Sequence, residues 1–592
     1  FERMEGVVTH LHLAAYFLVL ISILNTTKLW RWFLASNVIA SVLVAFYGLL
    51  QIWGVYEIMQ GGVRLDATLG NAGYLGGYLM MMFFVTAYLL AGCWGDKTWR
   101  YVYLTIMLLQ GFLIFKSQTR GAILGLVGGL LLALLSAGFL AGRRRPVMRR
   151  GALVALVVAS VLGGLFWLAR DTALVQNQPA LARVANISLE DNTVRSRFMI
   201  WEMSWAGVRE RPVFGWGPDN FVTVFGKYYN PDLYDQEPWF DRSHNAFLDW
   251  LVAGGFIGLF LYLSVFATAI WALLFRRQEN GQEEGFSVPE KSIILGLLAA
   301  YSFQNFFIFD NIVSYSLFLG ILGLIHYQLI QPVLAPDKKK EKTDRGKTVA
   351  KVGVGAVLGF GVVFNFAFLN PALAGVNLLS ALQQSGAGQY EKSLYYFQRA
   401  FSYRLPGSVE REQQLIYTAM AALRRAEVKD EVKAGFVALV REKVGKKLVA
   451  DEGQIILRLM YSEFLLLIGD EEEALTRLDE AVALSPNKQT SLLQAAQIKS
   501  AVGKFDEALA LAKRAFELGP EFGEVRKIYA LVALQSGDEV LALEILKPDF
   551  DSLAVDDDRY INYFSDQKNY RLVAEIWRQR VEANPDDTNI GA

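Results

Sequence analysis

The stretch Arg242-Ser-His-Asn-Ala-Phe-Leu-Asp-Trp-Leu-Val-Ala-Gly-Gly-Phe-Ile-Gly258 marks the point at which a long polar segment gives way to an apolar run. The polar segment covers roughly 171–243, and the apolar run continues to Phe275. A run of this length and composition predicts a helix that enters a membrane. His244 would then lie at the membrane surface. A histidine in that position either takes part in proton transfer or lies in the interface without a chemical role.

The totals for the chain exclude several classes of protein. With 592 residues, of which 53% are hydrophobic, the chain is too long for one domain and too apolar for an ordinary soluble protein. The 58 basic and 58 acidic residues balance, so nothing indicates a nucleic-acid partner. Cys93 is the only cysteine, which excludes a disulfide framework and a cysteine metal site, and four histidines leave little for a histidine cluster. We therefore expect neither a metal nor a cofactor.

Ten apolar runs are candidates for membrane spans, each near the length of about 20 residues that a bilayer requires. They cover 7–25, 33–53, 69–92, 100–116, 120–140, 151–170, 246–275, 291–309, 313–332 and 348–369. The first predicts a spanning helix, and no signal peptide is visible. Because the chain begins with Phe1 and not with an initiator Met, we expect residues or whole helices to precede it.

Basic residues fall in alternate connections between these runs, which gives the orientation. The basic groups are Lys28 with Arg31, Lys97 with Arg100, Arg143 to Arg150, Arg276 with Arg277, and Lys338 to Lys347. All of these connections are expected to be cytoplasmic. The remaining connections, including 54–68, 116–120 and 171–243, then face outward, and so does the chain after residue 370.

A repeat with a period of 34 residues begins in this last part of the chain. Gly469, Gly503 and Gly537 recur at this spacing, as do Ala474, Ala508 and Ala542. A helix–turn–helix unit of this length is typical of tetratricopeptide repeats, with the Gly and Ala expected where the two helices approach closely. We therefore predict an all-α protein: a polytopic transmembrane helical bundle in 1–370 with an extracytoplasmic segment 171–243, then an α-solenoid of tetratricopeptide-like repeats in 371–592. Such solenoids mostly present a concave binding surface.

The outward connections hold the residues that could carry chemistry. Arg120 lies in the short turn Lys116-Ser-Gln-Thr-Arg-Gly121, at or just inside the membrane surface, where an unpaired arginine is costly. Arg195 and Arg197 begin an amphipathic helix, and Arg64 and Asn71 precede the third apolar run. The alternative is that these arginines only reach toward the interface without binding anything. After the amphipathic helix, a turn with Gly215 and Gly217 would allow close approach of the backbone to a ligand.

Arginines at an outer membrane surface suit a lipid-linked diphosphate, because the guanidinium binds phosphate oxygens in pairs and stays charged. A nearby neutral histidine can take a proton from an attacking hydroxyl, while the arginines stabilise the charge on the departing diphosphate. The carboxylates of the segment show no spaced pair, which favours a metal-free mechanism. Its aromatic residues either stack on sugars or form the core of the segment; they are Trp201, Trp205, Trp216, Tyr228, Tyr229, Tyr234, Trp239 and Phe240.

Three ordered motifs resemble those of the O-antigen ligase and polymerase family. They are His244-Asn245 followed by Gly255 and Gly258; Arg197, Trp201, Pro212, Gly215, Gly217 and Phe221; and Thr119-Arg120-Gly121. The resemblance covers about 55–335. It implies a multi-pass glycosyltransferase that acts on undecaprenyl-diphosphate-linked glycans. His244 would be the base, and Arg197 and Arg120 would bind the diphosphate. Arg64, Asn71, Asn245 and Arg195 are further candidates for substrate binding.

The function expected from this resemblance is transfer of a lipid-linked oligo- or polysaccharide to an acceptor hydroxyl at the outer face of the bacterial cytoplasmic membrane. The acceptor would be a lipid glycan for a ligase, a growing chain for a polymerase, or a protein for an O-oligosaccharyltransferase. The repeats would dock the acceptor or a protein partner. Alternatives from other classes are a flippase for the same glycan and a membrane-anchored repeat scaffold. The appended repeats occur in only some members of the family and do not separate a ligase, a polymerase and a protein O-oligosaccharyltransferase.

Overall fold

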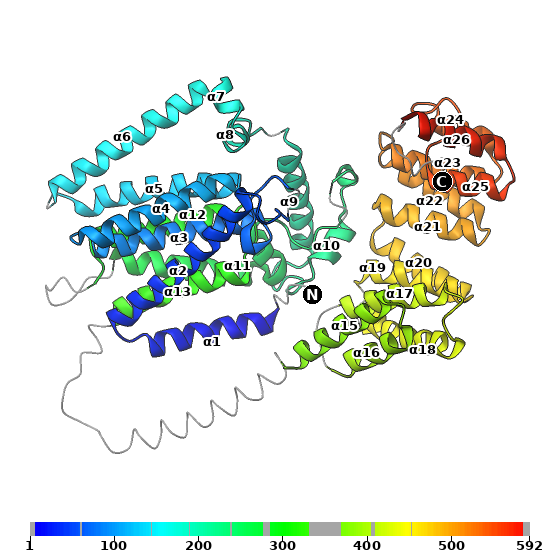
Figure 1. The fold of residues 1–592 in the computed structure, drawn as a ribbon, viewed down its shortest axis with the longest axis horizontal. Helices are drawn as coiled ribbons and strands as arrows, with labels where there is room; N and C mark the ends of the chain where they lie inside the picture. Colours follow the sequence, from blue (N-terminus) through cyan, green and yellow to red (C-terminus); the bar gives the residue numbers. More distant parts are fainter. Residues whose placement is uncertain are drawn as a thin grey trace, which may run out of the picture.

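The computed structural model describes residues 6–583 apart from 60–61, 144, 189, 237–238, 276–284, 331–368, 404–408 and 451–452. These residues form helices and connections, and no strand occurs among them. Figure 1 shows two groups of helices side by side, a bundle and a solenoid. The predicted all-α class is confirmed.

The bundle contains nine labelled helices. They are α1 (Val7–Ile23), α2 (Thr27–Ile52), α3 (Ala72–Gly92), α4 (Lys97–Lys116), α5 (Arg120–Ala141), α6 (Pro146–Ala169), α11 (Ala246–Phe275), α12 (Val288–Asn305) and α13 (Ile312–Ile330). Six of them, α2 to α6 and α11, are long and apolar enough to cross a membrane. This is the pattern of a multi-pass membrane protein.

Three of the other candidate spans also form helices of the bundle. Helices α1 and α13 match the expected runs 7–25 and 313–332 to within two residues at each end. The helix α12 lies within the bundle, but its first turn contains Pro289, Glu290 and Lys291 and it does not qualify by composition. The last candidate, 348–369, lies outside the described residues.

Small residues bring α5 and α12 close together. A side chain at Gly129 of α5 would overlap the carbonyl oxygen of Gly296 and the side chain of Ala300 in α12, and Gly125 lies against the carbonyl of Ala300. Close backbone approach of this kind is how membrane helices gain packing contacts. It places the first residue of α5, Arg120, beside the end of α12.

The segment 171–243 folds into short helices against the first part of α11. These are α7 (Ala173–Gln176), α8 (Pro179–Ala185), α9 (Asn192–Glu210), α10 (Phe221–Lys227) and the 3-10 turn η2 (Pro231–Leu233). A second 3-10 turn, η1 (Ala67–Leu69), follows α2. Ile200, Val224, Phe225 and Leu251 are buried in a shared core, so the segment is a packed cap on the bundle.

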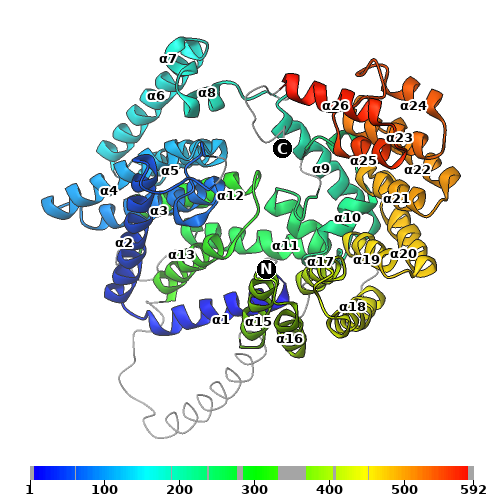
Figure 2. The same ribbon diagram turned by 45° about the vertical axis from the view of Figure 1, so that its right-hand side comes forward.

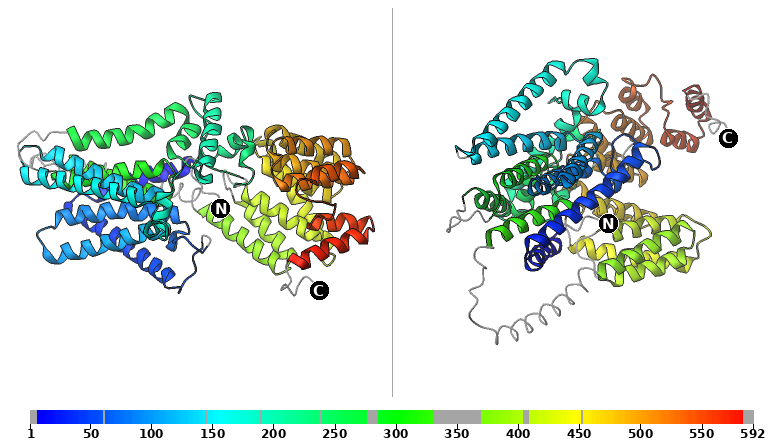
Figure 3. Two further views of the ribbon diagram at one scale, coloured as in Figure 1. Left: turned by 90° about the horizontal axis from the view of Figure 1, so that it is seen from above. Right: turned by 60° about the vertical axis from the view of Figure 1, so that its left-hand side comes forward.

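The repeats form a stack of helices that continues from α15 to α26. Their bounds are α15 (Asn370–Gly386), α16 (Tyr390–Ser402), α17 (Glu410–Leu423), α18 (Asp430–Ala450), α19 (Ile455–Leu467), α20 (Glu471–Leu484), α21 (Gln489–Ala501), α22 (Phe505–Glu517), α23 (Gly523–Gln535), α24 (Glu539–Leu546), α25 (Asp558–Asp566) and α26 (Tyr570–Ala583). The first of these helices begins at Asn370, and the expected domain boundary between 370 and 371 stays a prediction. Figures 2 and 3 show the cap helices α9 and α10 between the bundle and this stack.

The phased residues of the repeats have two different tasks. Ala474, Ala508 and Ala542 are fully buried between helices, as expected. The glycines were expected at a close approach too, but a side chain there would meet nothing within 4 Å. Gly469 instead turns the chain between α19 and α20 with φ +82°, a left-handed conformation that favours glycine.

Candidate active site

Arg120 is held in an ion pair at the mouth of the bundle. It is the first residue of α5, and its Nη1 donates to Oδ2 of Asp191 over 2.7 Å. Both side chains are mostly buried, with 23% and 21% of their surface exposed. Asp191 also caps α9 through the backbone N–H and hydroxyl of Thr193. The hydrogen bonds from Thr193 and then that from Arg120 lower the pKa of Asp191 to about 2, so this carboxyl is ionised at neutral pH.

Three more arginines surround this pair. Arg64 donates from Nη2 to Oγ1 of Thr119 over 3.3 Å. Burial, followed by the positive charges of Arg183, Arg197 and Arg120, lowers the pKa of Arg64 to about 10. Burial and Arg120 also lower the pKa of Arg183 and of Arg197. The structure thus brings together Arg64, Arg120 and Arg197, and it adds Arg183 of α8.

We call Arg64, Arg120, Arg183 and Arg197 the arginine cluster. The Nε atoms of Arg64, Arg120 and Arg183 are buried and donate to no group among the described residues. Four positive charges are set against the one carboxylate of Asp191, and buried donors without acceptors are costly. The first N–H groups of α5 add to this positive end, since no side chain caps the helix. The cluster is therefore chemically suited to an anion with several oxygens.

His244 lies in residues 242–245, which lead into α11 and which we call the strap; they are fixed from several sides. Its backbone has φ +54°, a conformation that is strained for a residue other than glycine. The ring is half-buried and makes edge contacts with Phe240 and Phe309 at 5.3 and 5.4 Å between centroids. Nδ1 lies 3.3 Å from the carbonyl oxygen of Arg242. If Nδ1 carries the proton and donates to this oxygen, Nε2 has the lone pair that a base requires.

Hydrogen bonds made by Asp249 and Asn245 fix the strap on either side of His244. Oδ1 of Asp249 accepts hydrogen bonds from the backbone N–H and the hydroxyl of Ser243, at 2.8 and 2.7 Å. Asn245 is buried, and its Oδ1 accepts from the N–H groups of Phe247 and Leu248, which caps the start of α11. Asn245 therefore supports the position of His244, and its side-chain oxygen accepts hydrogen bonds from N–H groups in the first turn of α11.

Two connections join the strap to the arginine cluster. Nε1 of Trp201, one helical turn after Arg197 in α9, donates to the carbonyl oxygen of Ser243 over 3.1 Å. The connection between α12 and α13 supplies the other link: the Arg197 guanidinium lies 5.9 Å from the centroid of Phe307, and Phe309 contacts His244. The imidazole and the guanidiniums thus lie at the same end of the bundle.

The glycine-rich turn packs against a break in α11. Gly255 has φ +61° and interrupts the helix. The N–H groups of Trp216 and Gly217 donate to the carbonyls of Val252 and Ala253, and Phe256 N–H donates to Pro212, at 2.8 to 2.9 Å. A side chain at Gly215 or Gly255 would overlap the backbone of the opposite segment. The close approach expected at Gly215 and Gly217 is therefore made to α11, which steadies the helix that begins with the strap.

The remaining predicted residues have other surroundings. Arg195 is exposed and forms an ion pair with Asp232 at 3.1 Å, on a different side of α9 from Arg197. Asn71 caps α3 through the N–H groups of Gly73 and Tyr74. Most of the aromatic residues of the cap pack in its core; Tyr229 and Phe240 are buried, whereas Trp205 is 41% exposed.

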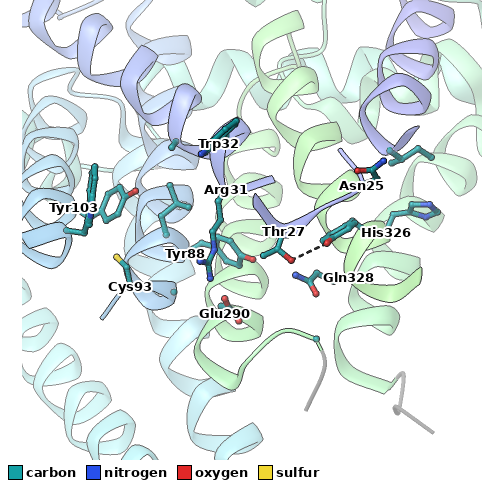
Figure 4. Close-up of a pocket in the computed structure, with 17 residues that line it drawn as sticks. Asn25, Thr27, Arg31, Trp32, Tyr88, Cys93, Tyr103, Glu290, His326 and Gln328 are labelled. Carbon is teal, nitrogen blue, oxygen red and sulfur yellow. Dashed lines mark hydrogen bonds between the residues drawn. The ribbon is translucent and has the colours of Figure 1, made fainter. Parts of the chain in front are cut away.

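Two cavities differ in their relation to this site. The larger, about 1080 Å³, lies where α2, α12 and the far ends of α3 and α13 meet, and Figure 4 shows Arg31, Tyr88 and Glu290 around it. It is at the opposite end of the bundle from Arg120. A smaller cavity of about 190 Å³ is lined by Tyr74 and Phe309, and the ring of Phe309 also contacts His244. Among the described residues, no group of three or more His, Cys, Asp or Glu is placed to hold a metal ion.

Comparison with known proteins agrees with the resemblance seen in the motifs. Residues 105–263 match the family model described as O-antigen ligase. This range contains Arg120, Arg197 and His244 and leaves out Arg64. No curated protein matches the chain. One solved structure, described as "Crystal structure of MamA protein", is 14% identical, with 33% of this chain and 95% of that chain covered and a TM-score of 0.24.

Proposed function

We propose that this protein transfers an oligo- or polysaccharide from undecaprenyl diphosphate to an acceptor hydroxyl at the outer face of the cytoplasmic membrane, without a metal ion. The observation that carries the proposal is the arginine cluster, in which four guanidiniums meet one carboxylate. A lipid–sugar diphosphate has a negative charge on each phosphate and several oxygens that accept paired hydrogen bonds. The match to the O-antigen ligase family model supports a glycosyl transfer of this kind.

In the proposed reaction, His244 takes the proton from the acceptor hydroxyl. The acceptor oxygen forms a bond to the anomeric carbon of the donor sugar, and the bond from that carbon to the diphosphate oxygen breaks. The lipid diphosphate leaves as an anion with one more negative charge than it had as a diester. Arg64, Arg120, Arg183 and Arg197 stabilise this charge because they are placed before the reaction begins.

The distribution of charge supports an outward-facing site. Lys28 and Arg31 lie at the start of α2, and Lys97 begins α4. These are the ends away from the arginine cluster, which adjoins the start of α5. By the positive-inside rule the basic ends are cytoplasmic, and the cluster and His244 face outward. The packed contacts between the cap and the repeats would then place the repeats outside as well.

Among acceptors, a lipid glycan is our first candidate because the matching model is described as a ligase. A polysaccharide polymerase and a protein O-oligosaccharyltransferase use the same donor chemistry, and the repeats would dock the acceptor or a protein partner in each case. A flippase needs basic groups along a path through the bilayer, whereas this cluster collects at one end. A scaffold whose work is done by the repeats alone would leave the cluster without a task.

The test is transfer by the purified full-length protein in lipid, given a lipid-linked glycan and candidate acceptors. We expect formation of a glycosylated acceptor together with release of undecaprenyl diphosphate. Arg197→Ala should abolish both, whereas Arg195→Ala, two residues away and paired with Asp232 on another side of α9, should keep them. Undiminished transfer by Arg197→Ala, or movement of the intact donor across the membrane without transfer, would overturn the proposal.

A further inference from the structure

The repeats dock onto the cap at several places along the stack. Nε2 of Gln489 in α21 donates to the carbonyl oxygen of Pro231 over 3.0 Å. Phe522, before α23, lies against Tyr234 with 4.9 Å between ring centroids. At Gly226 of α10, the side chain of Ile455 from α19 fills the space that a Cβ atom would need. The contact is therefore a packed interface that runs along α19 to α23, and Figure 2 shows α10 facing these helices.

Lys488 lies in the middle of this interface. Lys488 is fully buried, although it lies at the surface of the stack, just before α21. Nζ lies over the ring of Trp239 and at 5.0 and 5.3 Å from the centroids of Phe225 and Tyr229. Three aromatic side chains of the cap thus enclose one lysine of the repeats. We call Phe225, Tyr229 and Trp239 the aromatic cage.

The aromatic cage leads directly to His244. Phe225 is fully buried and lies 5.6 Å from Phe240, and Phe240 makes the edge contact of 5.3 Å with the imidazole. Trp239 precedes Phe240 in the chain, so Phe240 is joined to the cage by the backbone as well as by this contact. Because His244 has a strained backbone, its position depends on the packing around it.

We propose that Lys488 of the repeats is a positioning residue for His244, acting through the aromatic cage and Phe240. The inference rests on the transfer reaction proposed above. According to this inference the repeats help to position an active-site residue, in addition to docking any partner. A reacting group displaced by about 1 Å can cost on the order of a hundredfold in rate, so a modest shift of the ring would be measurable.

The variants separate packing from charge. Burial lowers the pKa of Lys488 to about 6, so near neutral pH the side chain that fills the cage is largely uncharged. Lys488→Ala should leave the cage underfilled and lower kcat roughly tenfold or more, with the KM for the donor unchanged because the arginine cluster is untouched. Lys488→Met keeps the length of the stem and should restore most of kcat. Lys513→Ala, on an exposed part of α22, is the matched control.

A second measurement does not depend on activity. The sequence has four histidines, so the imidazole signal of His244 can be assigned in an NMR spectrum by its loss in His244→Gln. The signal should move in Lys488→Ala, return toward the wild-type position in Lys488→Met, and stay in place in Lys513→Ala. An unmoved signal, or a higher donor KM with an unchanged kcat, would overturn the inference. Absence of transfer by the wild type would refute the proposed function alone, since the NMR result would still report the coupling.

Discussion

Replacement of Arg64 by methionine should make the protein more stable while it weakens binding of a diphosphate. Arg64 is a half-buried cation among three others, and its pKa falls from the ordinary 12.5 to about 10 because these surroundings disfavour the charged form. This fall corresponds to roughly 3 kcal/mol. Screening by solvent at the mouth of the site reduces the figure to about 1–2 kcal/mol. Because the folded-state pKa is lowered, the cost applies throughout the range below pH 10 and disappears only as Arg64 loses its proton.

Methionine keeps the apolar stem of Arg64 and removes both the charge and the buried Nε. The hydrogen bond to Thr119 is lost, but Oγ1 of Thr119 still donates to the carbonyl oxygen of Ala72 over 2.8 Å, which limits the penalty to about 1 kcal/mol or less. The balance favours a small net gain. Loss of a charged hydrogen bond to phosphate should weaken binding by about 1.5–3 kcal/mol, which is roughly a 10- to 150-fold rise in Kd.

The assay is thermal unfolding of the protein in lipid nanodiscs, with and without inorganic pyrophosphate. Wild type should be stabilised by pyrophosphate, since a ligand that binds only the folded state raises the unfolding temperature. Arg64→Met should start from an equal or higher temperature and gain less. Arg195→Met, which removes an exposed cation paired with Asp232, should behave like wild type. A destabilised Arg64→Met protein with an undiminished pyrophosphate response would refute the reasoning.

Three further predictions test the strap, the broken helix and the metal-free scheme. His244→Gly suits the positive φ of the strap and removes the base, so transfer should fall at least about a hundredfold while pyrophosphate still stabilises the protein; retention of transfer would argue against a histidine base. Gly255→Ala should lower the unfolding temperature because φ is +61° and the new Cβ would overlap Val213, whereas Gly254→Ala, with nothing within 4 Å, should be nearly neutral; equal behaviour of the two would contradict the docking described here. Treatment with EDTA should leave transfer rates unchanged, and a loss restored by divalent metal would contradict a metal-free mechanism.

The elements that the sequence predicted are those that depend on local patterns. Apolar runs and the spacing of Ala474, Ala508 and Ala542 report burial that recurs along one helix or one repeat. The alternation of basic connections also predicted that Arg120, Arg197 and His244 lie on the same side of the membrane. The bounds of α1 and α13 follow the apolar runs closely for the same reason.

Features that depend on contacts between distant segments were not predictable in the same way. Arg183 belongs to no motif, and its only signal was its place in the segment 171–243. The sequence did not distinguish Asp191 from the other carboxylates of the segment 171–243; the fold places it beside Arg120. The docking of the Gly215 turn on Gly255 joins two motifs that had been interpreted separately. The burial of Lys488 results from contact between the repeats and the cap, so neither part of the sequence predicted it alone.

The break at Gly255 constrains the order in which the protein is assembled. Carbonyl groups of Val252 and Ala253 obtain their partners from Trp216 and Gly217 of the cap, and without them they would face an apolar membrane at a cost of several kcal/mol. The cap is synthesised before α11 and, in the orientation proposed here, must be translocated ahead of it. Correct insertion of α11 therefore depends on a cap that has already crossed the membrane and folded. A delay in its translocation would leave the carbonyl groups of Val252 and Ala253 without these partners.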